Sequence, residues 1–563
     1  MNECIANDKS IRDFKLHDKS EVEPNKELDP YVFRYVVPFY FKSEFDDALK
    51  CIGEDINWKR KDDDDNKTEI DLFDHLKDEY YFEGGAEADK AKQGCEWKLE
   101  NCEKSLIFQD YIKFENVISE NPIDANDNNA KDSTLHYSLE FKIADGGLHL
   151  FRNKIGFLWY ELKPDFDSIN YNTVDKRGIN KTGVMLEFQH KIKELNRLTY
   201  FLTLEKNTNN IFLFGKWINT LLEPLDKLNS ESKDDIKKHN VVYFAQRKTD
   251  ANVSYFVKDL SKDKIVPENN FEFEPDKALL FCYACFKEED VSYEEQKLFA
   301  FRMANGVDNL KLSEQGSYTA EKPFDDTIWY ASQEGASIVT WSDSKFNYLE
   351  GKKADRVRYV YFKLFIKAIY QSYSLSVFSN RIHKDIPIIN KDDMDEKTGD
   401  KIFSLYWDVN NFLAKSASTS VSYMDNHTLF FVYLKKQLRI VEDINSITAG
   451  LEAINNLQKE ILQERIKEEA KIKEAEAKKR SEKTSALMGL LTLFNLGPGL
   501  AGIQLFFKVF ADLFGINESV SNIVGSVVWF IITCIVVFVT CKTLLEAKIF
   551  SSTFKLSKNN DKK

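Results

Sequence analysis

Hydrophobic and polar positions in the first 430 residues alternate between strand-like and helix-like patterns. The run at residues 30–41 is rich in aromatic and β-branched side chains, which is typical of a strand. More strands are expected in residues 134–163, with a hairpin turn at Gly146 and Gly147, in residues 278–286, and as a hairpin over residues 327–341. Helical spacing predicts helices over residues 43–52, 181–200, 211–225, 293–304, 355–382 and 402–412. This order predicts a mixed α/β (α+β) head.

The pattern changes after residue 430, where a long charged helix is expected to lead into two apolar segments. Apolar residues from Leu434 to Ile461 recur mostly every three or four positions, which predicts an oligomeric stalk over residues 431–485. Residues 486–507 and 523–541 contain no charged side chain. At 1.5 Å per residue they would reach roughly 33 and 28 Å, enough for a hydrocarbon core. The sequence therefore predicts a two-helix C-terminal transmembrane hairpin over residues 486–541.

Basic residues flank this hairpin on both sides. Six lysines or arginines lie in residues 471–483, six lysines lie in a basic tail over residues 542–563, and only Lys508 lies between the two segments. By the positive-inside rule both termini are expected in the cytoplasm. The expected localisation is the bacterial inner membrane, with a multi-pass topology. A flexible lead over residues 1–29 would precede a cytoplasmic sensor head over residues 30–430, with a sub-boundary near residues 230–240.

Composition narrows the classes of function. The chain has 563 residues and a formal net charge of -13 at pH 7, which argues against direct binding of DNA or RNA because that needs a basic surface. The net charge does not exclude a local basic site that binds a small nucleotide. The eight cysteines form no disulfide framework or metal site. The sequence contains no P-loop, HExxH or GxSxG motif, so we expect no catalytic residues and no enzyme.

Two hairpins and the helix before the second one carry polar residues suited to an anionic ligand. Arginine forks match phosphate groups, and polar side chains at a turn match the edges of a base. A tryptophan ring could stack on an adenine. The alternative interpretation is that these are ordinary surface turns and core aromatics. The candidate ligand-binding residues are Arg152, Asn153, Lys154, Trp159, Arg302, Asn305, Trp329, Ser332, Gln333 and Glu334.

The first apolar segment is interrupted by polar and helix-breaking residues. Asn495 and Gln504 are polar, and Pro498 lies between two glycines. Proline removes a backbone hydrogen bond and bends a helix. One interpretation is a structural kink with hydrogen bonds between helices. The other is that Asn495, Pro498 and Gln504 line a pore.

Residues 405–563 resemble, by pattern, the CorA superfamily of divalent-cation channels, in which a stalk helix leads into two membrane spans. The stretch Leu500-Ala501-Gly502-Ile503 is similar to the one that precedes the family's Gly-Met-Asn loop. That loop is missing here, and only Gly515-Ile516-Asn517 is similar to it. The resemblance implies a homo-oligomer, pentameric by analogy, in a lipid bilayer. The missing loop puts selectivity for Mg²⁺ in doubt.

The head resembles a narrower group, the CorA-like membrane effectors associated with type III CRISPR systems. The similar stretches are residues 150–162, 329–335, 356–378 and 422–438. This resemblance implies an antiviral effector that is gated by a nucleotide second messenger and acts by membrane permeation. The family's signal is a conjugate of S-adenosylmethionine and AMP. Two alternatives remain: a constitutive transporter that would associate with Mg²⁺, and a membrane-anchored oligomeric scaffold.

Overall fold

The computed structural model describes residues 31–60, 94–100, 105–111, 135–171, 181–195, 200–203, 214–229, 239–248, 257–259, 264–266, 273–287, 291–306, 320–341, 356–385, 396–416 and 421–496, with short helical pieces between residues 508 and 542. The chain divides into two compact units, Met1–Asn455 and Asn456–Lys563. Every candidate ligand-binding residue lies in the first unit.

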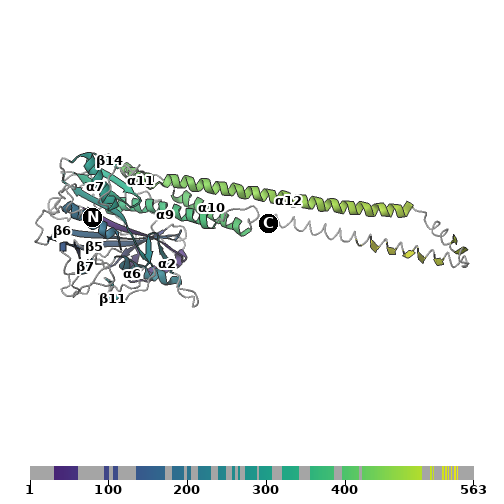
Figure 1. Cartoon of the computed structure of the whole chain (residues 1–563), viewed down its shortest axis with the longest axis horizontal. Helices are drawn as coiled ribbons and strands as arrows, with labels where there is room; N and C mark the ends of the chain where they lie inside the picture. Colours follow the sequence, from purple (N-terminus) through teal and green to yellow (C-terminus); the bar gives the residue numbers. More distant parts are fainter. Residues whose placement is uncertain are drawn as a thin grey trace. The chain divides into compact units, whose positions relative to one another are not determined.

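A large mixed sheet forms the centre of the first unit (Figure 1). Its twelve described strands follow the order β14-β15-β16-β13-β1-β6-β5-β3-β2, with β4 beside β5 and β7, and β8 beside β1. Neighbouring described strands are antiparallel except β13 and β16, which are parallel. The strands are β1 Tyr31–Phe41, β2 Trp58–Arg60, β3 Gly94–Leu99, β4 Ser105–Tyr111, β5 Leu135–Phe151, β6 Ile155–Tyr171, β7 Tyr200–Thr203, β8 Val241–Tyr243, β13 Leu279–Phe286, β14 Glu321–Phe324, β15 Thr327–Ser332 and β16 Gly335–Trp341.

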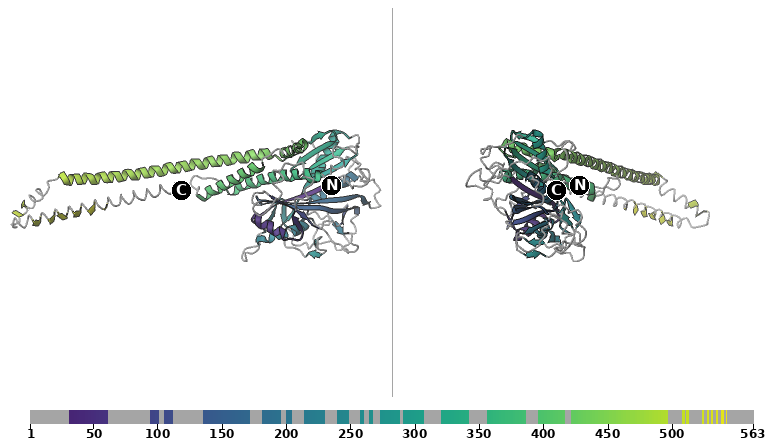
Figure 2. Two further views of the ribbon diagram at one scale, coloured as in Figure 1. Left: turned by 180° about the vertical axis from the view of Figure 1, so that it is seen from behind. Right: turned by 60° about the vertical axis from the view of Figure 1, so that its left-hand side comes forward.

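Helices cover both faces of this sheet. The helices α2 (Phe45–Gly53), α5 (Lys181–Lys193), α6 (Phe214–Asp226) and α7 (Tyr293–Asn305) pack on one face. The opposite face carries one turn of π-helix, η8 (Val357–Tyr361), which continues into α9 (Phe362–Asp385), and α11 (Asp425–Gln437). Helix α10 (Glu396–Ser416) lies beside α9, where Phe412 contacts Tyr370 and Phe378 (Figure 2). The remaining elements are a 3₁₀ turn, η6 (Lys227–Asn229), two small sheets, β10 (Val257–Asp259) with β11 (Lys264–Val266) and β9 (Gln246–Lys248) with β12 (Phe273–Pro275), and α12 (Ile440–Leu496).

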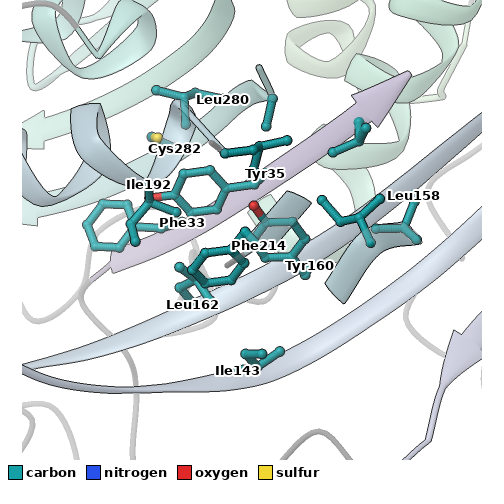
Figure 3. Close-up of a cluster of buried hydrophobic side chains, with 14 of the residues drawn as sticks. Phe33, Tyr35, Ile143, Leu158, Tyr160, Leu162, Ile192, Phe214, Leu280 and Cys282 are labelled. Atoms are coloured by element: carbon teal, nitrogen blue, oxygen red, sulfur yellow. The ribbon is translucent and has the colours of Figure 1, made fainter. Parts of the chain in front are cut away.

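The main hydrophobic core lies between the sheet and the first set of helices (Figure 3). Successive side chains of a strand point to opposite faces, so Phe33 and Tyr35 of β1 enter this core whereas Arg34 points to the α9 face. The rings of Tyr35 and Tyr160 stack with centroids 5.3 Å apart, and Phe214 stacks on Tyr160 at 5.2 Å. Because β1 is buried on both faces, its sequence is a nearly continuous apolar run.

Most predicted elements of the head are confirmed where the structure describes them. The strands at residues 30–41 and 278–286 and the hairpin at residues 327–341 correspond to β1, β13 and β15–β16, and the mixed α/β character is as expected.

The predicted turn at Gly146 and Gly147 is wrong, because β5 continues through both residues and turns at Arg152–Lys154 instead. A Cβ atom on Gly147 would lie 2.6 Å from Nε1 of Trp159. Gly147 therefore gives room to an indole within a strand.

The predicted transmembrane hairpin is wrong, and so is the multi-pass membrane localisation that depended on it. Among the described residues, no helix combines the length and the apolar character needed to cross a bilayer. Most of α12 is the charged stretch that ends at Lys483. The apolar end of this helix, from Thr484 to Leu496, spans only about 20 Å. Asn495 lies in the last turn of α12, whereas Pro498 and Gln504 lie outside the described residues.

The predicted single stalk helix also differs from the structure. Helix α11 ends at Gln437, and α12 begins only at Ile440. Between them Arg439 has a φ of 55°, the left-handed conformation that a continuous α-helix does not contain. The apolar periodicity continues across this break, so it gave no sign of where one helix ends.

Candidate functional site

The β5–β6 turn holds the first group of candidate residues. The guanidinium of Arg152 lies 3.9 Å from the carboxylate of Asp46, and Nζ of Lys154 lies 2.8 Å from that of Glu44. Both carboxylates are largely exposed, at 80% and 77%. Exposed ion pairs of this kind contribute about 0–1 kcal/mol. An anionic ligand could therefore replace either carboxylate at low cost.

Asn153, between these two cations, points the other way. Its Nδ2 donates a hydrogen bond to Oγ of Ser374 on α9 at 2.7 Å. The Ser374 hydroxyl in turn donates to the carbonyl of Tyr370 at 2.6 Å, one helical turn earlier. The β5–β6 turn is thus fixed to α9 through a buried polar chain.

The β15–β16 turn holds the second group and brings three predicted residues together. The hydroxyl of Ser332 donates to Oδ1 of Asn305 at 2.6 Å and accepts from the backbone N–H of Glu334 at 3.1 Å. Nζ of Lys193, at the end of α5, donates to the carbonyl of Asn305 at 2.7 Å and also pairs with the Glu334 carboxylate. Burial lowers the pKa of Lys193 even though Glu334 acts in the opposite direction.

Two consecutive residues of α9 lie near the two turns. Ser374 contacts Asn153 of the first turn, as described above. Its neighbour Tyr373 packs on Phe157 of β6 and on Phe244, with ring centroids 5.9 and 4.5 Å apart. Burial raises the pKa of Tyr373, and the nearby Glu334 carboxylate raises it further. Helix α9 is therefore within electrostatic or hydrogen-bonding range of both candidate turns.

The other predicted residues lie elsewhere. Both candidate tryptophans are buried and packed, since Trp159 faces the Arg34 guanidinium at 4.3 Å and Trp329 contacts Phe430 with centroids 5.1 Å apart. These positions leave neither indole with a ring face for an adenine. Arg302 is largely buried on α7, and Gln333 is exposed at the tip of its turn.

A buried ionic group, which the sequence did not indicate, lies between the sheet and η8–α9. Arg34 Nε is 2.8 Å from Glu161 Oε2, and Arg358 Nε is 2.7 Å from Glu161 Oε1. The Arg34 guanidinium also donates to the carbonyl of Arg358 at 2.7 Å and lies beside the contacting rings of Trp159 and Phe362. One carboxylate thus neutralises two guanidiniums across β1, β6 and η8, which fixes the start of α9 on the sheet.

Helix α9 also buries polar side chains along one stripe. Lys363, Lys367, Gln371 and Ser374 follow one another at intervals of three or four residues and are all buried. The predicted helix over residues 355–382 gave no direct indication that these polar residues are buried. Lys363 pairs with Glu96 of β3 at 3.5 Å. The sequence indicated this burial only indirectly: a helix with apolar residues on several sides is expected to be buried all round, including its polar side chains.

In comparisons with family models, with curated proteins and with solved structures, no match to the chain was found. The resemblance to CorA-like proteins therefore stays a prediction from the sequence. Within the described part of the chain, no group of three or more His, Cys, Asp or Glu side chains is arranged to hold a metal ion.

Proposed function

We propose that the first unit is a sensor for a small nucleotide, and that the ligand acts at the β5–β6 and β15–β16 turns. One observation carries this proposal: Ser374 of α9 hydrogen-bonds Asn153 of the β5–β6 turn, and its neighbour Tyr373 lies within electrostatic range of Glu334 in the β15–β16 turn. A ligand that rearranges either turn would change the surroundings of the same helix. Such coupling requires the ligand to bind two arrangements of α9 with different affinity.

The chemistry of the two turns supports an anionic ligand with hydrogen-bonding edges. Arg152 and Lys154 each pair with an exposed carboxylate, for which a phosphate oxygen could substitute. Ser332 and Asn305 are buried and bonded to each other, and their hydroxyl and amide could exchange that bond for one to a base or ribose. The resemblance to the CRISPR-associated effectors makes the conjugate of S-adenosylmethionine and AMP the first ligand to test.

The conformational change in such a sensor would be transmitted to α11. Helix α11 packs against α9, and Tyr433 of α11 hydrogen-bonds β15 directly, with its hydroxyl accepting from the N–H of Ala331 at 3.1 Å. A shift of α9 or of β15 would therefore reach α11, which precedes α12 in the chain. Ion flux and Mg²⁺ transport depended on the two predicted spans and are not part of the proposal.

The test is a binding measurement on the purified full chain. Isothermal titration with the S-adenosylmethionine–AMP conjugate, AMP and ATP should give binding for at least one of them. Arg152→Gln and Ser332→Ala should weaken it at least tenfold. Lys384→Gln, an exposed charge change at the end of α9, is the matched control and should leave binding unchanged. Absence of binding by all three ligands, or equal binding by all variants, would refute the proposal.

A second candidate function is an oligomeric scaffold, and one feature of α12 favours it. Leu457, Leu462, Ile466 and Ile472 are large aliphatic side chains exposed on this 57-residue helix. Exposed aliphatic residues along a long helix are typical of a surface that pairs with a second copy. Light scattering should then give a mass above the 65.5 kDa of one chain. The variant Leu462→Gln/Ile466→Gln should lower that mass, whereas a monomeric parent chain would exclude the scaffold.

A further inference from the structure

The turn that leads into α9 is wider than an α-helical turn. In η8 (Val357–Tyr361) the N–H of Phe362 donates to the carbonyl of Val357, five residues earlier. In an α-helix the same N–H would donate to the carbonyl of Arg358, four residues earlier. Single π turns are rare, and they often occur at functional sites. This turn therefore contains one residue more than an α-helix needs at that point.

The carbonyl of Arg358 accepts a hydrogen bond from the sheet instead. Nη1 of Arg34, on β1, donates to this carbonyl at 2.7 Å. The side chain of Arg358 reaches the sheet as well, with its Nε 2.7 Å from Oε1 of Glu161 on β6. Both Arg34 and Glu161 are buried. One backbone contact and one side-chain contact of the same residue thus fasten the π turn to the sheet.

The other end of the π turn contacts α11. The hydroxyl of Tyr361 accepts a hydrogen bond from Nδ2 of Asn426 at 3.0 Å. The Tyr361 ring also meets the rings of His427 and Phe430 edge-on, with centroids 5.1 Å apart in both pairs. These three partners lie in the first two turns of α11. Arg358 and Tyr361, three positions apart, therefore hold the sheet on one side and α11 on the other.

The backbone of this turn has a second hydrogen-bonding register. If the N–H of Phe362 moved to the carbonyl of Arg358, the turn would become α-helical and Arg34 would lose its acceptor. The residues before the new bond would move by one helical position, a rotation of about 100° and a shift of about 1.5 Å. This movement would carry Arg358 away from Glu161, whereas Tyr361 would keep its place on α9.

We propose that η8 is a latch with these two registers. The π register fastens α9 to the sheet. The α register releases α9 together with α11, which stays tied to it through Tyr361 and Asn426. The buried pair of Arg358 and Glu161 makes the π register the major state. The latch does not depend on a nucleotide. If a nucleotide acts at the two turns, the latch supplies the two arrangements of α9 that this response requires.

Deletion of Tyr359 should lock the latch. In the shortened chain Phe362 follows Val357 by four residues, so the hydrogen bond between them becomes α-helical. Arg358 and Tyr361 keep their contacts with the sheet and with α11, because only the extra residue of the turn is removed. Tyr359→Ala is the matched control, since it changes the same half-buried position and preserves the length of the turn.

Hydrogen exchange of the purified full chain, followed by mass spectrometry without a nucleotide, measures the effect. Two segments are compared, residues 361–364 at the start of α9 and residues 426–432 of α11. In the shortened chain the amides of both segments should exchange at least tenfold more slowly than in the parent chain, because the register that releases them is lost. The Tyr359→Ala variant should exchange like the parent chain.

The response of α11 distinguishes a latch from a turn that only frays. Fraying would alter the exchange of residues 361–364 alone, and that result overturns the proposal, as does equal exchange of the shortened and parent chains. If the shortened chain does not fold, the parent chain decides at high pH, where exchange reports the rate of opening. Both segments should then open with one rate constant, because they are released as a unit. Two different rate constants would overturn the latch.

Discussion

Arg34 and Glu161 form a buried ion pair across two neighbouring strands, with Nε 2.8 Å from Oε2. The Arg34 guanidinium also lies 4.3 Å from the ring centroid of Trp159 and 4.4 Å from that of Phe362, two rings that contact each other. Glu161 accepts from Arg358 as well. A single carboxylate therefore holds the sheet and the first turn of the helix that covers it.

Replacing Glu161 with Gln should destabilise the first unit strongly. The amide keeps the shape but removes the charge that pairs with both Arg34 and Arg358 in a buried layer. Breaking one side of a buried ion pair typically costs about 3–5 kcal/mol. Urea unfolding followed by tryptophan fluorescence should show the loss as a lower midpoint. A midpoint equal to that of the parent chain would mean that the pair contributes nothing to stability.

Asp145 supplies the matched control, because it also faces Arg34, at 3.7 Å. Burial raises the pKa of Asp145 above its ordinary value, although Arg34 acts to lower it. The folded state therefore favours the protonated carboxyl, so removing the charge should not destabilise it. Asp145→Asn is expected to leave the urea midpoint unchanged or to raise it. A loss as large as that of Glu161→Gln would contradict this distinction between the two carboxylates.

Gly335 and Gly450 should respond to the same substitution with opposite signs. A Cβ atom on Gly335 would lie 2.4 Å from the carbonyl oxygen of Leu280 and 2.6 Å from that of Ala304. Gly335→Ala should therefore lower the free energy of unfolding by more than about 2 kcal/mol. At Gly450, in α12, nothing lies within 4 Å of the new atom, so Gly450→Ala should stabilise the chain by about 0.5–1 kcal/mol. Circular dichroism during thermal unfolding measures both.

The hydrogen bond between Asn153 and Ser374 should appear as a coupling energy. A double-mutant cycle with Asn153→Ala and Ser374→Ala isolates it, and about 0.5–1.5 kcal/mol is expected for a buried pair. If the nucleotide proposal is correct, saturating ligand should change this coupling. Strict additivity of the two substitutions, with and without ligand, would show that the turn and α9 are energetically independent.

The Lys193–Glu334 pair should make stability depend on pH in the acidic range. Burial acts to raise the pKa of Glu334, but Lys193 and then Lys277 bring it below its ordinary value of 4.5. The folded state thus binds its proton less readily than the unfolded state does. The contribution is complete above pH 4.5 and is lost as the pH falls through the lower folded value. Unfolding midpoints between pH 3 and 7 should show a smaller decrease for Glu334→Gln than for the parent chain.

The sequence was sufficient to predict most strands and helices of the head, because their signal is local. The aromatic run of β1 and the hairpin at residues 327–341 are examples, as are Ser332 and Glu334 at that hairpin's turn. Strand pairing was not predictable, since β1 contacts β6 and β13 from distant parts of the chain. The ionic group of Arg34, Glu161 and Arg358 depends on this pairing, so no local pattern indicated it.

Two errors show where periodicity misleads. Gly146 and Gly147 resemble a hairpin turn in sequence, but a Cβ atom on Gly147 would lie 2.6 Å from the indole of Trp159. Lys363 of α9 is a charged residue of a kind that is usually exposed, yet it is buried and pairs with Glu96 of β3. In both cases the deciding contact comes from a residue that is remote in the chain, which a pattern within one element does not contain.

The central position of β1 has a consequence for synthesis of the chain. This strand ends at Phe41, but its partner β13 ends only at Phe286. At about 5–20 residues per second, roughly 12–50 s separate the emergence of the two. During that time one edge of this largely apolar strand is open to other nascent chains. Production of the protein should therefore depend on chaperone capacity, and fragments that stop before β13 should aggregate.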